Sequence, residues 1–336
     1  MSRRVAVIGA GSWGTTLANL LAKKGHPVRL WSYEEDVAEA IATTRENPRY
    51  LPGITLHPGL EATHRLEDAV AGAEVIVSVT PSQHVRRVMA EAAPAIRPDA
   101  LVVSASKGIE VATLQTMAEV LEAVLPAPLA ERACFLSGPS FALEVAREQP
   151  TAVTVASRDD AAALDAQELF QTDYFRVYTN RDVRGVELAG ALKNVIALAA
   201  GMATGLGLGH NARAALITRG LAEMTRLGRA LGAEDSTFAG LAGMGDLILT
   251  CTGELSRNRT VGIELGKGRN LEDILGTMNM VAEGVATTRA AQALAERAGV
   301  EMPIVHEVHA VLFEGRNPRV AVENLMLREP KAENWR

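Results

Sequence analysis

Short apolar runs alternate with helical patterns along the first half of the chain. Runs with the length and flanking turn residues of strands occur at Val5–Ile8, Val28–Trp31, Glu74–Val79, Leu101–Ser104, Cys134–Leu136 and, at the far edge of the sheet, Thr151–Ala156 and Arg176–Tyr178. Patterns between them predict helices such as Trp13–Lys24, Ser82–Ala92 and Leu114–Leu125. Because strands and helices alternate, we predict an α/β fold with a parallel, doubly wound sheet of the Rossmann type.

The pattern changes near residue 181, where strand signals nearly vanish and alanine, leucine and glycine dominate long helical patterns. We predict a dinucleotide-binding domain over residues 1–180 and an all-helical substrate and catalytic domain over residues 181–336. No Ser/Gly-rich linker separates them, which favours a shared interface. The longest apolar stretch, Val186–Ala203, has Lys193 and Asn194 at its centre. Since a central lysine costs about 2.5–3.5 kcal/mol in a membrane, we expect a buried helix and no membrane span.

Composition narrows the class of protein. The 336 residues are 48% apolar and 22% charged, which is typical of a globular protein long enough for two domains. The net charge of −6 and the absence of a long basic run argue against a nucleic-acid partner. A small anionic substrate is still compatible with this charge, because it needs only a local cationic pocket.

Cysteines and histidines indicate the compartment and exclude some chemistry. Cys134 and Cys251 are isolated, so they form neither a disulfide framework nor a zinc site, and a reducing cytosol is expected. His306 and His309 are three residues apart, but no third ligand follows, so we expect no metal. The apolar run Val5–Ile8 is too short for a signal-peptide core. We therefore expect a cytoplasmic protein.

Gly9, Gly11 and Gly14 form a G-x-G-x-x-G pattern between a predicted strand and a predicted helix. The first glycine permits a tight turn, the second lets the backbone approach a pyrophosphate, and the third lets helix and strand pack closely. The helix N-terminus attracts the phosphates. This loop predicts an oxidoreductase that binds a nicotinamide dinucleotide. Trp13 suits the core and a wall of the cofactor site equally well.

The residues after the second strand do not decide between NAD and NADP. An acidic side chain at this strand end pairs with the ribose hydroxyl of NAD, whereas an arginine suits NADP. Tyr33 precedes Glu34 and Glu35, so the carboxylates come slightly late, and no arginine stands at positions 32 to 35. Both cofactors remain open.

Two lysines and an aspartate are candidates for chemistry. Lys107 follows a predicted strand, at the sheet edge where ligands bind, although a solvated loop lysine is the alternative. Lys193 has apolar neighbours on every helical turn. Burial lowers a lysine's pKa and suits it to acid–base catalysis, unless the side chain reaches the surface or pairs structurally. Asp246, beside flanking glycines, either orients Lys193 and accepts a substrate hydroxyl or caps the next helix.

A polar cluster follows at Ser256, Arg257, Asn258 and Arg259. It supplies two cations, a hydroxyl and an amide at the start of a predicted helix, and arginine binds phosphate as a planar fork. The cluster is either a phosphate site or a solvated basic face.

Taken together, these residues make the chain closely resemble the bacterial-type NAD(P)-dependent glycerol-3-phosphate dehydrogenases. The resemblance extends almost from end to end. It is carried by the glycine loop and by the segments 47–53, 106–110, 137–142, 192–194, Asn211, 219–220, 240–247, 256–259 and 283–285.

The resemblance implies reversible hydride transfer between NAD or NADP and sn-glycerol 3-phosphate or dihydroxyacetone phosphate, with Lys193 as proton donor or acceptor. It implies these residues around the substrate: Lys107, Gly138, Ser140, Lys193, Asp246, Ser256, Arg257 and Asn258. It implies these residues at the dinucleotide: Ser12, Trp13, Tyr33, Tyr50, Lys107, Ala142, Arg257, Val281 and Glu283. Tyr33 departs from the basic or imidazole residue often found at its position. The family is typically cytoplasmic, homodimeric and tied to glycerophospholipid synthesis.

Two other functions fit parts of the pattern. A related lysine-dependent dehydrogenase acting on a hydroxy acid would share the glycine loop and Lys193. A redox-sensing module would bind dinucleotide without chemistry and would not need a buried Lys193.

Overall fold

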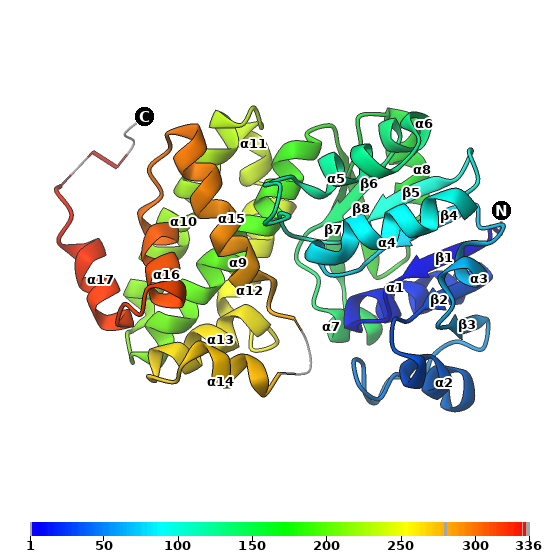
Figure 1. Cartoon of the computed structure of the whole chain (residues 1–336), viewed down its shortest axis with the longest axis horizontal. Helices are drawn as coiled ribbons and strands as arrows, with labels where there is room; N and C mark the ends of the chain where they lie inside the picture. Colours follow the sequence, from blue (N-terminus) through cyan, green and yellow to red (C-terminus); the bar gives the residue numbers. More distant parts are fainter. Residues whose placement is uncertain (1, 279–280, 331, 334–336) are drawn as a thin grey trace.

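The computed structural model describes residues 2–278, 281–330 and 332–333. Figure 1 shows two lobes side by side: a sheet with helices packed on it, and a wholly helical lobe. Separate apolar clusters fill the two faces of the sheet, and a third fills the helical lobe. The predicted fold class, a doubly wound sheet followed by a helical domain, is confirmed.

Eight strands form one sheet in the order β3-β2-β1-β4-β5-β6-β7-β8. They are β1 (Val5–Ile8), β2 (Val28–Trp31), β3 (Leu60–Thr63), β4 (Val75–Ser78), β5 (Leu101–Ser104), β6 (Cys134–Ser137), β7 (Thr151–Ala156) and β8 (Phe175–Asn180). β1 lies between β2 and β4, with Val5 level with Val28 and Val75. The strand order reverses at β1, and ligands of such sheets bind beyond the carboxyl ends of the strands at this point.

Helices of the sheet lobe are α1 (Ser12–Lys23), α2 (Glu35–Thr44), α3 (Leu66–Val70), α4 (Val85–Ala92), α5 (Met117–Val124), α6 (Ala127–Glu131), α7 (Ala142–Ala146) and α8 (Asp160–Phe170), with short 3₁₀ turns η1 (Ser82–His84) and η2 (Ala93–Ala95). The helical lobe holds α9 (Val183–Gly205), α10 (His210–Ala230), α11 (Asp235–Phe238), the π-helical turn η3 (Leu241–Gly245), α12 (Asp246–Thr252), α13 (Arg257–Gly266), α14 (Leu271–Gly276), α15 (Glu283–Ala298), α16 (Pro303–Phe313) and α17 (Pro318–Met326). The predicted domain boundary near residue 180 falls between β8 and α9.

Three details differ from the sequence prediction. β3 was not expected, because its edge position leaves most of Leu60–Thr63 partly exposed and weakens its apolar pattern. β7 runs antiparallel to β6. The connection between them holds only the five-residue α7, so the chain turns back instead of crossing the sheet as a parallel connection requires. Helix α5 begins at Met117, later than predicted, because Leu114 has a left-handed φ of 59°.

Helix α9 is the centre of the helical lobe. By length and composition it could cross a membrane, but its apolar window is entirely buried inside the protein. Helices α10, α12, α13 and α15 pack around it. The predicted buried core helix is therefore confirmed.

Glycines let α9 and α13 pack backbone against backbone. A Cβ on Gly201 would lie 2.2 Å from the carbonyl oxygen of Arg259, and a Cβ on Gly262 would lie 2.1 Å from that of Leu198. Both distances are far below van der Waals contact. The two helices can approach this closely only because both positions lack a side chain.

We expect Gly262→Ala to lower the free energy of unfolding by about 1–3 kcal/mol, because the added methyl forces α13 away from α9. Urea denaturation of the purified protein measures this. Gly276→Ala is the matched control, since at that exposed position no atom of the described residues lies within 4 Å of a built Cβ. Equal stability of the two variants would contradict the packing argument.

Candidate functional site

The glycine loop connects β1 to α1 at the point where the strand order reverses. Gly9 has a φ of +119°, and its built Cβ would lie 2.9 Å from the carbonyl oxygen of Val79. A Cβ on Gly14 would lie 1.8 Å from the carbonyl oxygen of Gly9, so helix and loop touch there. Gly11 has nothing within 4 Å and offers no side-chain cap to the helix that begins at Ser12. This open cradle at a helix N-terminus fits a dinucleotide pyrophosphate.

Asp246 joins two lysines that come from different lobes. Its Oδ1 accepts a hydrogen bond from Lys193 Nζ at 2.6 Å, and its Oδ2 accepts one from Lys107 Nζ at 2.7 Å. Lys193 Nζ also donates to Thr250 Oγ1 at 2.9 Å, and Lys107 Nζ to the Gly138 carbonyl at 3.1 Å. Asp246 is 1% exposed and Lys193 is 7% exposed. We call Lys107, Asp246 and Lys193 the ion triad.

Burial sets the acid–base properties of the ion triad. It lowers the pKa of Lys193 to about 8; the Asp246 carboxylate opposes this shift, and the charge of Lys107 reinforces it. Burial alone would raise the pKa of Asp246, but the charges of Lys107 and Lys193 and their hydrogen bonds hold it below its ordinary value. Near neutral pH the carboxylate is ionised, and Lys193 can give or take a proton.

An amide network lies beside the ion triad and includes a residue that the sequence pattern does not single out. Asn258 Nδ2 donates to Asn194 Oδ1 at 2.9 Å, and Asn258 Oδ1 accepts from the Gly284 amide at 2.9 Å. Together these bonds tie α13 to α9 and α15. Asn194 and Thr250 were not among the candidates. Two features of the sequence could have identified them. Asn194 is adjacent to Lys193, and Thr250 follows Asp246 by four residues, which places both side chains on the same helix face.

Gly138 and Ser140 lie where β6 ends. Gly138 has a φ of +138°, and a Cβ there would lie 2.9 Å from the Cα of Val153. Its carbonyl accepts hydrogen bonds from Lys107 Nζ and from Ser140 Oγ, the latter at 3.0 Å. The structure therefore brings both predicted substrate residues beside the ion triad.

Ser256 and Arg257 stand at the start of α13. Ser256 Oγ accepts from the Arg259 amide at 3.3 Å and so caps the helix. The Arg257 residue is exposed, and the Glu283 carboxylate attracts its guanidinium. The cluster thus combines a helix N-terminus with a cation, which is the arrangement that favours a phosphate.

Glu283, the first residue of α15, reaches across to the sheet lobe. Its Oε1 accepts from the Ser82 amide at 3.0 Å, and its Oε2 accepts from Ser82 Oγ at 2.5 Å. Burial raises the pKa of Glu283, although the bonds from Ser82 oppose this shift. A Cβ on Gly108 would lie 3.2 Å from Glu283 Oε2, so the residue lies beside the loop that carries Lys107.

Three other residues predicted to contact the dinucleotide, Trp13, Ala142 and Val281, differ in their exposure and in their contacts. Trp13 is half-buried, and its ring centroid lies 6.4 Å from that of Phe175, so it packs against the core. The Ala142 carbonyl accepts from Thr16 Oγ1 at 3.1 Å, which ties α7 to α1. Val281 is 52% exposed. Their contacts with a cofactor stay predictions.

Two tyrosines near β2, Tyr33 and Tyr50, differ in their exposure and in their contacts. Tyr33 is 71% exposed, and its ring lies edge-on to that of Trp31 at 6.4 Å. Tyr50 is half-buried, and its hydroxyl donates to Glu34 Oε1 at 2.7 Å. Glu34 is not among the residues predicted to contact the cofactor.

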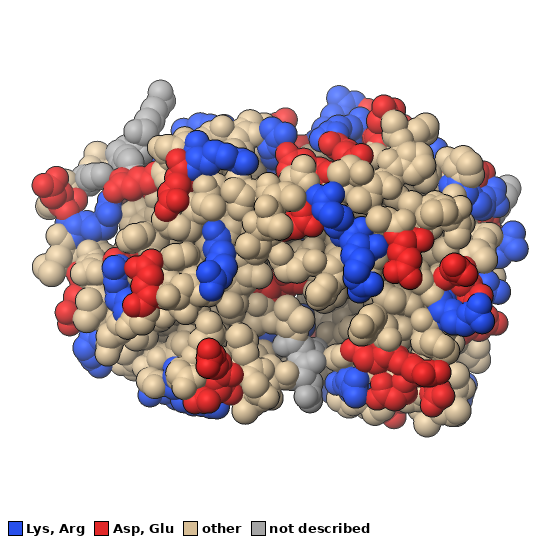
Figure 2. Space-filling view, in the orientation of Figure 1, with Lys and Arg blue, Asp and Glu red and all other residues tan. Residues whose placement is uncertain are grey.

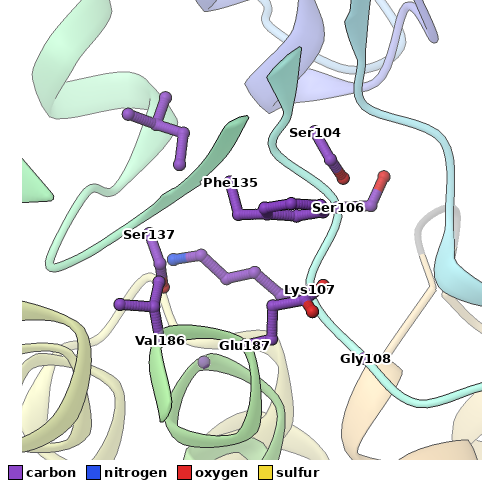
Figure 3. A pocket seen from close by; sticks show the side chains of 10 residues that line it. Ser104, Ser106, Lys107, Gly108, Phe135, Ser137, Val186 and Glu187 are labelled. Carbon is purple, nitrogen blue, oxygen red and sulfur yellow. The ribbon is translucent and has the colours of Figure 1, made fainter. Parts of the chain in front are cut away.

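A narrow cavity separates the carboxyl ends of β5 and β6 from α9. Figure 3 shows the Lys107 side chain extending into it from the loop after β5. The hydroxyls of Ser104 and Ser137 are buried and have no hydrogen-bond partner among the described residues. Glu187 also lines the cavity, and its Oε1 accepts from the Ala118 amide at 3.0 Å. Burial raises the pKa of Glu187 to about 8.

Metal and nucleic-acid sites were predicted to be absent. Among residues 2–278, 281–330 and 332–333, no group of three or more His, Cys, Asp or Glu side chains is placed to hold a metal ion. His309 Nδ1 instead lies 3.0 Å from Glu314 Oε1. Figure 2 shows acidic and basic side chains intermingled on the visible face, without an extended basic patch.

Two family models match the chain. The description "NAD-dependent glycerol-3-phosphate dehydrogenase N-terminus" covers residues 4–163, and the corresponding C-terminus covers residues 182–323. The chain is 61% identical to a glycerol-3-phosphate dehydrogenase (NAD(P)+) of Geobacter metallireducens over 333 residues, which is 99% of each chain. It is 61% identical to the enzyme of that name from Geobacter sulfurreducens over 335 residues, which is 100% of each.

A solved structure agrees with these sequence comparisons. The crystal structure of glycerol-3-phosphate dehydrogenase from Coxiella burnetii matches with a TM-score of 0.93 and 40% identity. It covers 97% of this chain and 99% of that one. Both lobes are therefore shared, together with their relative placement.

Proposed function

The chain belongs to the NAD-dependent glycerol-3-phosphate dehydrogenase family, and we propose that it reversibly transfers a hydride between NAD(P)H and dihydroxyacetone phosphate, giving sn-glycerol 3-phosphate. The resemblance inferred from the sequence is confirmed. The observation that carries the proposal is the buried ion triad at the carboxyl edge of a dinucleotide-binding sheet.

The ion triad serves the proton half of the reaction. The bound nicotinamide supplies the hydride for reduction and accepts it for oxidation. Lys193 spends two of its three N–H groups on Asp246 and Thr250 among the described residues, which leaves one for the carbonyl oxygen of the substrate. The positive charge of Lys193 stabilises the substrate alkoxide as it forms, and transfer of a proton from Lys193 then neutralises the alkoxide. Asp246 holds Lys193 in place, and Lys107 has a third N–H for the same substrate.

The phosphate of the substrate is assigned to the start of α13. Arg257 offers a charged fork, and Asn258 Nδ2 keeps a second N–H beyond its bond to Asn194. Contacts with the phosphate, which is remote from the reacting carbon, orient the substrate, and their binding energy contributes to the rate. Gly138, Ser140 and Ser256 complete the proposed surroundings.

A substrate panel tests the function directly. Purified protein is mixed with NADH or NADPH and dihydroxyacetone phosphate, and loss of the reduced nicotinamide absorbance is followed. We expect turnover with this substrate and none with lactate-like hydroxy acids in the reverse assay. Activity on the acids alone would favour a hydroxy-acid dehydrogenase. Dinucleotide binding without any oxidation would favour a sensing module.

The rate should depend on pH in opposite ways in the two directions. Reduction needs the protonated Lys193, whose pKa is about 8. We therefore expect kcat/KM for dihydroxyacetone phosphate to be level below pH 8 and to fall as pH rises through that value. Oxidation needs the neutral amine, so its kcat/KM should rise with pH up to about 8 and then level off. Initial rates across this range measure both, and reduction that accelerates above pH 8 would remove Lys193 as the acid.

The remaining assignments rest on the family. We propose a homodimer, located in the cytoplasm, that supplies sn-glycerol 3-phosphate to glycerophospholipid synthesis. Sedimentation at several concentrations tests the dimer, since one chain has a mass of 35.7 kDa. A species of single-chain mass throughout would reject it.

A further inference from the structure

Residues 105–116 connect β5 to α5 and carry Lys107, and we call them the Lys107 loop. Figure 3 shows the Lys107 side chain leaving this segment. The loop has no helix or strand, and one bridge, between Ile109 and Thr116, links its two halves. A segment without regular structure has many accessible conformations. The contacts of the loop therefore decide where Lys107 stands.

Neutral hydrogen bonds hold the backbone of the Lys107 loop against the segment that precedes α4. Ser106 Oγ donates to the Thr80 carbonyl at 2.6 Å. Gln83 Nε2 donates to the Ile109 carbonyl at 2.8 Å, and Gln83 Oε1 accepts from the Val111 amide at 3.0 Å. One glutamine side chain thus holds the loop residues on both sides of position 110.

A buried ion pair at position 110 adds to these bonds. Glu110 is 7% exposed, and its carboxylate accepts from Arg86 Nε at 3.0 Å and from Arg86 Nη2 at 2.8 Å. Thr113 Oγ1 also donates to Glu110, and Arg86 Nη2 donates to Gln115 Oε1. The hydrogen bonds from Arg86 lower the pKa of Glu110, so the carboxylate is ionised near neutral pH. The guanidinium fork therefore fixes both ends of the turn at residues 110–115 to α4.

The Glu110–Arg86 pair stands apart from the reacting groups. Its other partners belong to the Lys107 loop itself, and none of them is part of the ion triad. Lys107 comes three residues before Glu110, and its ammonium reaches Asp246 on the other lobe at 2.7 Å. A shift of the loop would change that contact, and displacing a reacting or orienting group by about 1 Å can cost about 10²-fold in rate.

We propose that Glu110 is a positioning residue, which through its pair with Arg86 fixes the Lys107 loop on α4 and so keeps Lys107 at Asp246. The inference rests on the proposed function for the reaction that it assists. Glu110 acts through Lys107 and is assigned no contact with substrate or cofactor. A pair that only stabilised the sheet lobe would leave the contact between Lys107 and Asp246 unchanged in every variant that folds.

The pH profile of reduction reports where Lys107 stands. Asp246, Lys107 and Cys251 are the titratable groups that act on Lys193, and the charge of Lys107 lowers the pKa of Lys193. Burial raises the pKa of Cys251 to about 12, so its thiol stays neutral in the relevant range. If Lys107 leaves Asp246, the pKa of Lys193 should rise. The fall in reduction should then move to higher pH, which a loss of stability alone would not cause.

Glu110→Gln tests the proposal, because glutamine keeps the shape of the side chain and removes its charge. In initial-rate kinetics, kcat/KM for dihydroxyacetone phosphate should fall by about 10–100-fold, and the fall with pH should move to higher pH. Arg86→Lys is the second variant. It keeps the charge and loses the planar fork, so both quantities should change in the same direction. This variant gives the same test if Glu110→Gln does not fold.

A measurement without turnover follows Lys107 directly. The purified proteins are treated briefly with acetic anhydride, and acetylation of Lys107 is quantified by mass spectrometry of its peptide. In either variant, release of the ammonium from Asp246 should raise this acetylation at least about threefold, because the loop opens more often. Lys267 is the internal reference, since it is exposed and pairs only locally with Glu264 at 2.8 Å.

Asp99→Asn is the matched control. Asp99 accepts from Arg97 Nε at 2.9 Å and from Arg97 Nη2 at 2.7 Å, which is the same two-point geometry in an exposed pair of the same lobe. Its kcat/KM should stay within about twofold of the unaltered protein, because exposed pairs contribute little.

Unchanged Lys107 acetylation and an unchanged pH profile in the folded variants would overturn the proposal, as would equal effects of Glu110→Gln and Asp99→Asn. Increased Lys107 acetylation in Glu110→Gln would support the positioning role even if the unaltered protein did not oxidise NADH or NADPH with dihydroxyacetone phosphate. That absence of turnover would overturn the proposed function alone.

Discussion

Replacing Lys193 by alanine is expected to lower kcat/KM for dihydroxyacetone phosphate by about 10²–10⁴-fold, the range typical for loss of a positioned acid–base group. The amine is the group of the ion triad that titrates near neutrality, and it lies at the centre of α9. The fold should survive, because Asp246 keeps its bond to Lys107 at 2.7 Å. Initial-rate kinetics measure the loss.

The dinucleotide provides the internal check on this variant. Among the described residues, Lys193 Nζ bonds to Asp246 and Thr250 and not to the glycine loop, so the Kd of NADH should stay within about threefold of the unaltered protein. Lys267→Ala is a suitable control, because that exposed lysine pairs only locally with Glu264 at 2.8 Å. Near-normal turnover by Lys193→Ala would remove the residue from the mechanism. Loss of NADH binding as well would point to a collapsed site.

Asp246→Asn should have the second-largest effect, with kcat/KM for reduction near neutral pH falling by about 10²-fold or more. The two lysines bond to different oxygens of Asp246, and in asparagine one of these becomes an NH2 donor, so one lysine loses its bond. The Asp246 charge also holds the pKa of Lys193 up against burial. Removing that charge leaves more of the amine neutral at pH 7 and unable to act as an acid.

The pH profile separates this role from a merely structural one. Since the pKa of Lys193 should drop in Asp246→Asn, the fall in reduction should move to lower pH than in the unaltered protein. Asp235→Asn controls for charge removal, because Asp235 forms an exposed pair with Arg229 on α10. A slower enzyme whose profile keeps its position would mean that Asp246 only supports the fold.

Local patterns carried much of the prediction. Alternating runs placed every strand except β3, and the glycine spacing identified the cradle at Gly9–Gly14. Lys193 was a candidate because a charged side chain inside a long apolar helix is costly to bury unless it is paired or used in chemistry. The strand positions, the tight turn at the glycine loop and the burial of Lys193 could be predicted because burial periodicity and glycine conformations are local properties that neighbouring residues reveal. The acid–base role of Lys193 stays a prediction.

Other features depend on contacts between distant segments. Nothing near Lys107 shows that it shares Asp246 with Lys193, since Lys107 and Asp246 are 139 residues apart. Thr250 and Asn194 acquire roles only once α12 and α13 pack on α9. Strand β7 pairs with β6 in the antiparallel sense, and which strands become neighbours is visible only in the folded sheet.

Glu34 shows the division most clearly. By position it comes too late to serve the end of β2, and the sequence alone left NAD and NADP open. Hydrogen bonds from Ser32 and Tyr50 return its carboxylate to the strand end. The sequence by itself determined the fold class, the cofactor class and the burial of Lys193 inside an apolar helix, because these follow from local periodicity and residue chemistry. Only the tertiary structure decided which charges meet, because folding alone brings distant side chains within hydrogen-bond distance.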